Sequence, residues 1–333
     1  MSTKPTVAII GCGKQAPKHV SGFKAANENV DLVLVDIDEN NAKQMGDELS
    51  LPWSTDLDTV LSDPNVTALD ICTPTASHLP LILKTLEAQK DFFCEKPLCD
   101  TVEEAQKIAG ALQDTNNIGM IGYVYRFNPV FQNIKNALSE KALGDVVTAQ
   151  FRIGGRGSHQ VWKHRKETNG GALSEMMVHM LDLAIWYFGP VASVEVLVDE
   201  LKRPQRLIQG IVEDVDAEDL LLVRAKMKSG ADVLLQADML TPAFSQLVEI
   251  QGENGSAFGS IQPDRPSYLF LDQPISNYDK GRTDIAVENT NLFHAQMGTF
   301  LDAITTRSEP AVCTVADSLH VMQAVDMIRT QMK

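Results

Sequence analysis

The chain has 333 residues, 44% of them hydrophobic, and no run of eighteen or more apolar residues, which predicts one or two globular domains and no membrane-spanning helix. Lys and Arg total 29 against 44 Asp and Glu, a net charge of -15, which is the wrong sign for a nucleic-acid surface and unfavourable at an anionic membrane. We therefore expect a small-molecule partner, and neither nucleic acid nor a membrane.

The cysteines and the first residues indicate the compartment. The five cysteines are odd in number and show no paired metal-ligand spacing, so we expect reduced thiols that are mostly buried. The beginning, MSTKPTVAII, enters a strand pattern without the features of a secretory signal. Both observations favour a cytoplasmic protein.

Residues 1–122 alternate short apolar runs with amphipathic segments. Five runs are typical of strands that are buried on both faces: VAIIG, VDLVLVD, VTALDICT, DFFCEKP and IGMIGYV. One intervening helix begins with TVEE, in which Thr101 and Glu104 fit a capping box. This order predicts an α/β fold with a doubly wound parallel sheet and right-handed crossovers.

Residues 123–333 follow a different pattern. A helix (NPVFQNIKNALSE), a strand (DVVTAQFRI), a Gly- and Arg-rich loop and an apolar helix precede the strands VASVEVLV, DLLLVRAKM, ADVLLQADM, SQLVEIQG and SYLFLD. Consecutive strands joined by turn residues predict an α+β domain with an antiparallel sheet. Helical spacing returns from about residue 288, with Thr314 capping a last helix. We place the domain boundary at 122/123 and leave open whether the C-terminal helix packs back on the first domain.

The run VAIIGCGKQA has the pattern GxGxxA between a strand and a helix. Gly11 permits a tight turn, Gly13 lets the backbone approach a pyrophosphate, and the free amides at the helix start face the phosphates. Asp36 ends the second strand, where a carboxylate accepts ribose hydroxyls and repels a 2′-phosphate. The pattern predicts a Rossmann domain that binds NAD in preference to NADP; an ordinary Gly-rich turn and a helix-capping Asp36 are the alternatives. The loop residues expected at the cofactor are Gly11, Cys12, Gly13, Lys14 and Gln15.

Two further strands end in polar residues, in ICTPTASH and FCEKP. Ligands of doubly wound sheets bind outside the carboxyl ends of the strands, so these residues are expected to face the cofactor. They are Thr73, Pro74, His78, Glu95 and Lys96. The alternative for Lys96 is a solvated loop lysine that pairs with Glu95.

A third candidate site lies in GGALSEMMVHMLD. We expect a buried α-helix over residues 173–188, apolar except for a stripe formed by Glu175, His179 and Asp182. Glu175 and His179 share a face at helical pitch, and either bind a metal, carry a proton or form a buried ion pair. The spacing is not that of HExxH and no further ligands follow at suitable spacing, so we expect no metal.

The loop GGRGSHQVWKHRKETNGG and the crossover near residue 125 supply three candidate substrate contacts. Trp162 is expected to wall the nicotinamide side, because such loops commonly cover bound ligands. Tyr125 and Arg126 follow the domain crossover and are expected to face the same cleft. For Arg126, an ion pair across the domains is an equal alternative to binding a carboxylate or sugar oxygens of the substrate.

Several of these segments together resemble the glucose–fructose oxidoreductase / inositol 2-dehydrogenase / MocA (Gfo/Idh/MocA) family over nearly the whole chain. They are GCGKQA, Asp36, CTPTASH, CEKPL, GYVYRFNP and GGALSEMMVHMLD, in the family's order and spacing. The resemblance implies an NAD(P)-binding Rossmann domain followed by a substrate-binding and oligomerisation domain, whose large open sheet often forms the interface of a homodimer or homotetramer.

The resemblance also implies roles for individual residues. The lysine of the family's EKP motif maps onto Lys96 and contacts the substrate hydroxyl and the nicotinamide ribose, and the histidine of its D-x-G-x-H segment maps onto His179, the proton acceptor or donor. The aspartate of that segment maps onto Glu175, and Met177 replaces its glycine. Glu175 either reaches the substrate or turns aside to hold Lys96 or His179.

The chemistry expected from the resemblance is hydride transfer between NAD and a carbinol carbon of a sugar, polyol, cyclitol or sugar derivative. Two alternatives stay open at this point. One is an enzyme that keeps NAD bound and oxidises its substrate transiently, to cleave a glycoside or shuttle hydride. The other is a non-catalytic protein that binds NAD or a sugar for regulation.

Overall fold

The computed structural model describes residues 4–156, 160–287 and 291–332. The chain forms two compact units, Met1–Phe127 with Asn291–Met322 and Asn128–Thr290 with Gln323–Lys333. The last helix, α9 (Val315–Arg329), begins in the first unit and ends in the second. Among the described helices, none is long and apolar enough to cross a membrane. The assignment of residues 1–122 to the cofactor and 123–333 to substrate and oligomer contacts stays a prediction.

The first unit is built on six parallel strands in the order β3-β2-β1-β4-β5-β6. This confirms the predicted doubly wound α/β sheet, whose strand order reverses between β1 and β4, so that ligands bind outside the carboxyl ends of these strands. Five strands match the predicted runs, and only the two-residue β3 was not expected. The strands are β1 (Thr6–Ile10), β2 (Asp31–Val35), β3 (Trp53–Ser54), β4 (Val66–Ile71), β5 (Asp91–Cys94) and β6 (Gly119–Ile121).

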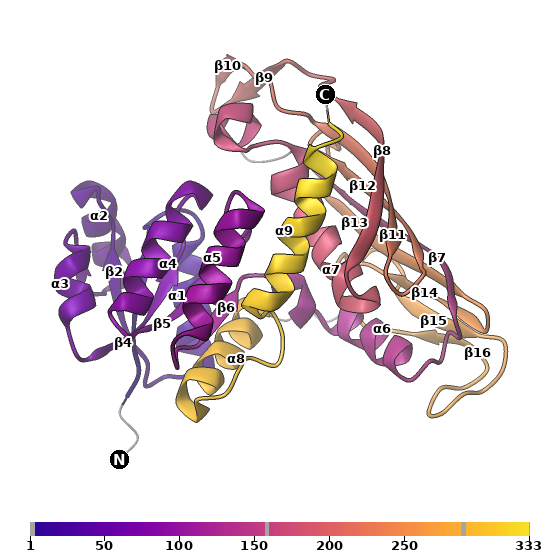
Figure 1. The fold of residues 1–333 in the computed structure, drawn as a ribbon, viewed down its shortest axis with the longest axis horizontal. Helices are drawn as coiled ribbons and strands as arrows, with labels where there is room; N and C mark the ends of the chain where they lie inside the picture. Colours follow the sequence, from indigo (N-terminus) through magenta and orange to yellow (C-terminus); the bar gives the residue numbers. More distant parts are fainter. Residues whose placement is uncertain (1–3, 157–159, 288–290, 333) are drawn as a thin grey trace. The chain divides into compact units, whose positions relative to one another are not determined.

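Helices connect and flank this sheet (Figure 1). Side chains cap several of them: Asp38 accepts a hydrogen bond from the Asn40 amide, and Thr101 accepts one from the Glu104 amide as predicted. The helices of this unit are α1 (Ala16–Ala26), α2 (Glu39–Leu49), α3 (Leu57–Ser62), α4 (His78–Glu87), α5 (Val102–Gln113) and α8 (Leu292–Thr306), with the short turns η1 (Thr75–Ser77) and η2 (Val124–Phe127).

Helix α8 follows the second sheet in the sequence but packs on α1 in the first unit. A glycine permits this packing, because a Cβ at Gly22 would lie 2.8 Å from the carbonyl oxygen of Phe293. After α8, the chain returns to the parallel sheet, where the Ile121 amide donates to the Cys313 carbonyl at 2.9 Å. The C-terminal segment 291–322 therefore completes the first unit.

The second unit contains an eight-stranded sheet in the order β16-β15-β14-β13-β7-β12-β11-β8. All its neighbours pair antiparallel except β12 with β7, which confirms the mostly antiparallel sheet. The strands are β7 (Val146–Gly154), β8 (Val191–Glu200), β11 (Leu220–Met227), β12 (Asp232–Asp238), β13 (Ser245–Gly252), β14 (Gly255–Gly259), β15 (Tyr268–Leu271) and β16 (Gly281–Asp284), and a separate hairpin holds β9 (Gln205–Ile208) and β10 (Ile211–Asp214).

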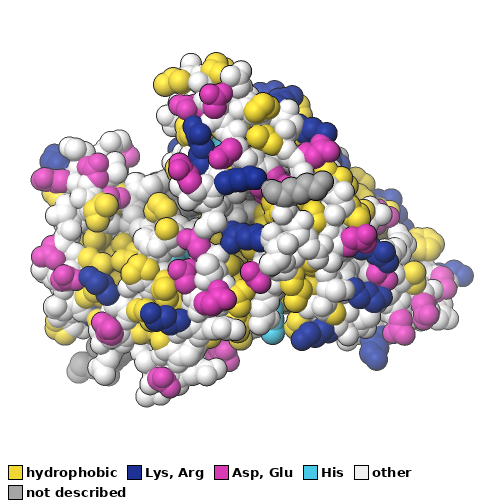
Figure 2. All heavy atoms as spheres, turned by 45° about the horizontal axis from the view of Figure 1, so that its top comes forward, with side chains coloured by type: hydrophobic (Ala, Val, Ile, Leu, Met, Phe, Trp, Pro, Cys, Tyr) yellow, Lys and Arg dark blue, Asp and Glu magenta, His cyan; other side chains and the backbone are white. Residues whose placement is uncertain are grey.

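One face of this sheet is covered by helices α6 (Pro129–Ser139) and α7 (Val178–Phe188). The Tyr187 hydroxyl on α7 donates to the Phe131 carbonyl on α6 at 2.9 Å, and the ring of Phe151 on β7 lies 6.0 Å from the ring of Tyr187. The strands alternate buried and exposed residues, and the exposed apolar side chains include Val147 at 60% and Phe270 at 47% exposure. On the molecular face seen in Figure 2, acidic and basic side chains are interspersed.

The start of α9 is fixed by a reciprocal pair of hydrogen bonds. Thr314 Oγ1 accepts from the Asp317 amide, and Asp317 Oδ2 accepts from the Thr314 amide, both at 3.0 Å. This is the arrangement of a capping box, and it confirms Thr314 as the cap. Helical structure was expected from about residue 288, but residues 288–290 lie outside the described chain and α8 begins at Leu292.

We expect Thr314→Ala to lower the free energy of unfolding by about 1 kcal/mol, because an alanine at this position leaves the Asp317 amide without its acceptor. Thermal and urea unfolding would measure the change. Thr305→Ala on the exposed side of α8 is the control and should stay within about 0.5 kcal/mol of the parent. Equal effects of the two substitutions would contradict the capping role.

Candidate functional site

A cavity of about 730 Å³ opens at the carboxyl ends of β1, β2 and β4. The residues that line it come from the ends of these three strands and the loops after them, from the loop after β3 with the start of α3, and from α4 and the turn before it. Five of the predicted cofactor residues are among them: Gly11, Gly13, Asp36, Thr73 and Pro74. The cavity therefore lies where the reversal of strand order predicts a ligand.

The glycines of the first loop are required by geometry. Gly11 has φ +96°, and a Cβ there would lie 2.9 Å from Thr73 Cγ2, so any side chain would be strained and would also displace the loop after β4. In front of Gly13 there is open space, because a Cβ added to this glycine would have no other atom within 4 Å. This space lets a ligand approach the backbone at the start of α1.

Asp36 is held in a fixed orientation by two backbone amides. Its Oδ2 accepts from Cys12 at 2.7 Å and its Oδ1 accepts from Asp38 at 2.9 Å. Each carboxylate oxygen keeps lone-pair capacity for a further donor. Burial, and then the charge of Asp36, raise the pKa of the Cys12 thiol to about 11, so Cys12 is a neutral packing group beside the cavity. The carboxylate suits the two hydroxyls of a ribose.

The cofactor was also expected at Lys14 and Gln15, at the start of α1. Gln15 is the N-cap residue and makes no capping bond with its side chain, and its Oε1 is buried without a hydrogen-bond partner. A buried acceptor normally has a donor. This unpaired oxygen, the space at Gly13 and the oriented Asp36 together fit a dinucleotide that brings hydroxyl or amide donors to the loop.

His78 holds two of the predicted site loops together. Its Nδ1 lies 3.0 Å from the Pro97 carbonyl oxygen and its Nε2 lies 2.9 Å from the Thr73 carbonyl oxygen. The side chain is 1% exposed, and burial lowers its pKa. His78 thus links the loop after β4 to the loop after β5 through its ring, and direct contact with the cofactor stays a prediction.

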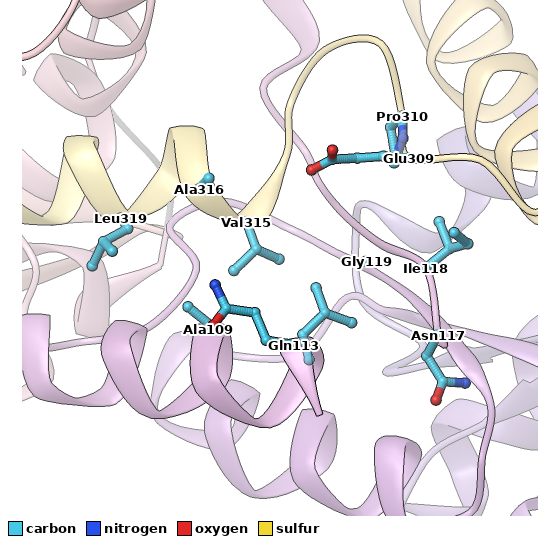
Figure 3. A pocket seen from close by; sticks show the side chains of 11 residues that line it. Ala109, Gln113, Asn117, Ile118, Gly119, Glu309, Pro310, Val315, Ala316 and Leu319 are labelled. Carbon is cyan, nitrogen blue, oxygen red and sulfur yellow. The ribbon is translucent and has the colours of Figure 1, made fainter. Parts of the chain in front are cut away.

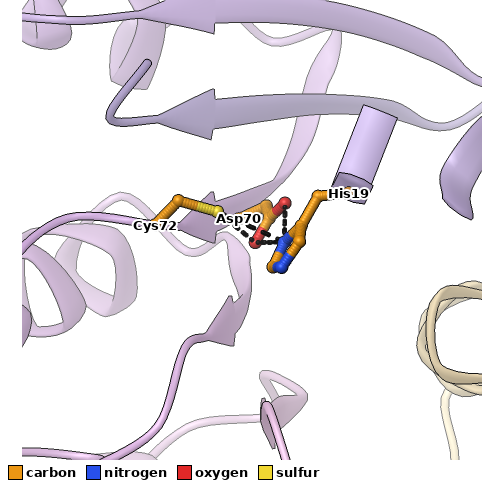
Figure 4. Close-up of side chains that lie close together, drawn as sticks. All are labelled: His19, Asp70 and Cys72. Atoms are coloured by element: carbon orange, nitrogen blue, oxygen red, sulfur yellow. Dashed lines mark hydrogen bonds and ion pairs between the residues drawn. The ribbon is translucent and has the colours of Figure 1, made fainter. Parts of the chain in front are cut away.

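A second buried histidine, which the sequence reasoning missed, lies on α1 (Figure 4). His19 Nδ1 is 2.9 Å from Asp70 Oδ2 on β4, and its Nε2 is 2.9 Å from Glu95 Oε1 after β5. Cys72 Sγ lies 3.2 Å from the same Nδ1. The one signal in the sequence was a histidine among the apolar residues of α1, on the side of the helix that also buries Ala16 and Phe23.

His19, Asp70 and Cys72 are also the one group in the described part of the chain with ligand atoms close enough to hold a metal ion. Their separations, 2.9 Å from nitrogen to oxygen and 3.2 Å from sulfur to nitrogen, are those of hydrogen bonds. Burial, and then the charge of Asp70, raise the pKa of the Cys72 thiol to about 12. The group is therefore a hydrogen-bonded cluster with a neutral thiol.

In the second unit, the segment with Glu175 and His179 departs from the expected regular α-helix. Residues Leu173–Met177 form a π-helical turn, and α7 begins only at Val178, whose amide donates to the Leu173 carbonyl five residues earlier. Glu218 fixes the start of this turn, because its Oε1 accepts from the Leu173 amide at 2.9 Å. Wide turns of this kind are frequent at functional sites.

The Glu175 carboxylate accepts a hydrogen bond from Lys163 Nζ at 2.6 Å, a partner that was not expected. The same ammonium lies 5.0 Å from the centre of the Trp162 ring. Glu175 and His179 are both partly exposed, while Met177 is buried. The structure thus brings Trp162 and Glu175 together through Lys163. Residues 157–159 of the candidate loop lie outside the described residues.

Tyr125 and Arg126 both lie on η2 in the first unit. Arg126 is 1% exposed, and its Nη1 donates to Asp317 Oδ2 at 2.9 Å. Asp317 belongs to the same unit, so this ion pair lies within one unit, and an ion pair of Arg126 across the domains stays a prediction. Tyr125 is partly exposed, and burial raises its pKa. Contact of either side chain with a substrate stays a prediction.

A smaller cavity of about 290 Å³ lies between α5, residues 117–119 and the segment from Glu309 to the start of α9 (Figure 3). Most of its lining is apolar, and Gln113, Asn117 and Glu309 supply polar atoms. It shares no residue with the large cavity. We assign it no part in binding the dinucleotide.

We expect Asp36→Ala to weaken binding of the predicted dinucleotide about 10- to 100-fold, because hydrogen bonds to a charged group are each worth about 1.5 to 3 kcal/mol. Titration of NADH fluorescence would measure the dissociation constant. Asp38→Ala, which removes the cap of α2, is the matched control and should leave affinity nearly unchanged. Unaltered affinity in Asp36→Ala would show that the ribose lies elsewhere.

The buried Glu218 leads to a prediction about how the stability of the protein depends on pH. Burial raises its pKa to about 7, so the folded protein favours the neutral carboxyl, and the stability it contributes is lost as pH rises from about 4.5 to about 7. We expect Glu218→Gln to match the parent at pH 5 and to be more stable at pH 9, by an amount on the order of 1 to 3 kcal/mol.

Urea unfolding of both proteins at the two pH values checks this expectation. The exposed Glu167→Gln on η4 (Lys166–Thr168) serves as the control for the loss of a charge. A difference between Glu218→Gln and the parent that does not change with pH would contradict the raised pKa.

Comparison with known proteins agrees with a dinucleotide-binding site in the first unit. Residues 6–123 match the model of the oxidoreductase family with an NAD-binding Rossmann fold, and residues 131–258 match the Gfo/Idh/MocA C-terminal domain. The scyllo-inositol 2-dehydrogenase (NAD(+)) of Bacillus subtilis (strain 168) is 28% identical over 257 residues, covering 75% of this chain and 72% of the relative. The myo-inositol 2-dehydrogenase of Thermotoga maritima is 26% identical over 293 residues, covering 82% and 84%.

Solved structures show the same fold. A levoglucosan dehydrogenase in complex with NADH and L-sorbose superposes with a TM-score of 0.88 at 20% identity, covering 98% of this chain and 96% of that one. An oxidoreductase domain protein from Kribbella flavida gives 0.89 at 22% identity, covering 99% and 97%. The resemblance inferred from the motifs is confirmed: the chain belongs to the Gfo/Idh/MocA family of oxidoreductases and carries the NAD-binding Rossmann fold of that family.

Proposed function

We propose that this protein is an NAD-dependent dehydrogenase that transfers a hydride between the nicotinamide and a carbinol carbon of a sugar, polyol or cyclitol. The observation that carries the proposal is the cavity at the reversal of strand order, with open space at Gly13 and an oriented Asp36. Asp36 favours NAD over NADP, because its charge repels a 2′-phosphate. The relatives named inositol dehydrogenases and the neighbour bound to L-sorbose support a polyhydroxylated substrate.

In the proposed reaction, bound NAD⁺ supplies the hydride acceptor. The chain must take the hydroxyl proton as the carbon becomes a carbonyl, and we assign this step to His179, because an imidazole titrates near neutral pH. We assign Lys96 to the substrate oxygen, where its ammonium stabilises developing negative charge. Lys96 is the second residue after β5 and is partly exposed, and His179 lies in the first turn of α7.

Glu175 takes a supporting part in this proposal. Its carboxylate is bound to Lys163, and Lys163 also lies over the Trp162 ring. The bond to Lys163 occupies one oxygen of the Glu175 carboxylate. We therefore propose that Glu175 holds Lys163 and Trp162 at the substrate side of the second unit, where Trp162 supplies an apolar wall.

We further propose a cytoplasmic homodimer or homotetramer. The eight-stranded sheet leaves exposed apolar side chains that include Val147, Leu197 and Phe270, and a second copy of the sheet would cover such a surface. All five cysteines are free thiols and four of them are buried, which is in keeping with a reducing compartment.

We expect Lys96→Ala and His179→Ala each to lower kcat by about 10² to 10⁴, the usual contribution of general acid–base catalysis. The assay is NADH absorbance with a panel of inositols, sugars and sugar acids. Lys107→Ala and His294→Ala, both at exposed helix positions, are the matched controls and should keep full activity.

The panel also separates the alternatives. No turnover of any compound, or full activity in both variants, would contradict the proposal. Conversion of a compound without net NADH would instead indicate transient oxidation by retained NAD. Tight NAD binding with no chemistry at all would favour a regulatory binding protein.

A further inference from the structure

We propose that His19 is a positioning residue for the reaction, and that it acts by fixing the Glu95 carboxylate next to Lys96. This inference rests on the proposed function, because it assigns Lys96 to the substrate oxygen. His19 lies on α1 and does not itself line the nucleotide cavity, although its ring contacts Cys72, which does. Its effect on catalysis is therefore indirect.

The ring of His19 joins three elements of the first unit. It belongs to the helix that begins at the dinucleotide loop, it bonds Asp70 near the end of β4, and it bonds Glu95 directly after β5. Glu95 Oε2 in turn accepts from the Lys96 amide at 3.2 Å. One side chain thus connects the cofactor helix to the residue pair that carries the proposed catalytic lysine.

The two hydrogen bonds define the charge of the ring. Both ring nitrogens face carboxylate oxygens, and an ionised carboxylate only accepts, so the ring satisfies both bonds only as a doubly protonated imidazolium. Burial alone would lower the pKa of His19, but the charge and hydrogen bond of Asp70 raise it well above its usual value.

Such a cluster is a costly way to fill a core. Desolvation of buried charges can exceed their mutual attraction, and apolar residues of similar volume are often at least as stabilising. His19 and Asp70 are both fully buried, and Glu95 is 8% exposed. We infer instead that His19 and Asp70 lie at the end of the sheet because they fix the orientation of Glu95 and, through it, of Lys96.

The other groups that face the cluster come from the same strand ends and from α8. The thiols of Cys72 and Cys94 flank the cluster, and burial raises the pKa of both. The charge of Lys96 acts on Glu95. His78 also senses the charge of Glu95. From α8, the Phe293 ring packs 5.4 Å from the His19 ring. The nearest opposite charges to Glu95 are therefore His19 and Lys96.

Loss of the His19 charge has a specific consequence for Glu95. Burial alone would raise the pKa of Glu95, but the hydrogen bond and charge of His19, with the charge of Lys96, hold it below its usual value. In His19→Gln the bond to Glu95 is weaker and uncharged, so Glu95 takes up a proton at higher pH than in the parent. Protonated Glu95 no longer attracts the Lys96 ammonium, and activity falls at acid pH.

The test compares His19→Gln, Glu95→Gln and the double variant by full kinetics from pH 5 to pH 9. We expect His19→Gln to lower kcat by about 10- to 100-fold, since a misplacement of about 1 Å costs about 10²-fold. The KM for NAD should change little, and a new acid limb should appear in the pH profile of kcat. The double variant should lack this limb and match Glu95→Gln. Phe23→Leu, a buried change on the same helix, controls for packing.

Unchanged kcat and pH profile in His19→Gln, with an active parent, would overturn the positioning role, as would losses that simply multiply in the double variant. An inactive parent would instead overturn the proposed function. If His19→Gln does not fold, nitrogen NMR of the parent decides: one of its seven histidines should keep both ring nitrogens protonated at pH 8.5, and should change in Glu95→Gln. A spectrum with every ring neutral at that pH would overturn the proposal.

Discussion

Two buried histidines connect the loops that follow β4 and β5, and the rest of the candidate site depends on these connections. His78 bridges the Thr73 and Pro97 carbonyls, and His19 bridges Asp70 and Glu95. Loops at the carboxyl ends of parallel strands are otherwise free to move apart, because the sheet itself ends there. With both rings in place, the loop against Gly11 and the segment that carries Lys96 have a fixed spacing. A nucleotide cavity and the lysine that we propose as catalytic can then serve one ligand.

The second unit meets a similar constraint in a different way. Glu218 binds the Leu173 amide, and a π-helical turn follows before α7 becomes regular. The wide turn carries Glu175, whose carboxylate holds Lys163. The resemblance to the family implies Asp and Gly at the positions where this chain has Glu175 and the buried Met177. We infer that the wider turn makes room for both the longer side chain of Glu175 and the larger side chain of Met177.

Local patterns in the sequence predicted much of the fold. Apolar runs located five of the parallel strands, and GxGxxA with Asp36 located the cavity, because both signals are local. Strands β14 and β16 were missed because GSAFG and GRTD lack apolar alternation. The π-helical turn was missed because it depends on a hydrogen bond to Glu218, which is far from it in the sequence. The spacing of apolar residues carries no information about such a bond. The partners of His19 and Arg126 were missed for the same reason, since Asp70, Glu95 and Asp317 become neighbours only in the folded chain.

The central claim is that the first unit holds NAD for hydride transfer from a carbinol carbon. The most direct measurement uses inositols and sugars deuterated at the carbinol carbons, with NMR of the coenzyme after turnover. The account predicts deuterium at C4 of the nicotinamide ring and a slower reaction than with unlabelled substrate. Oxidised product with an unlabelled coenzyme, or no reaction with any member of the panel, would contradict it.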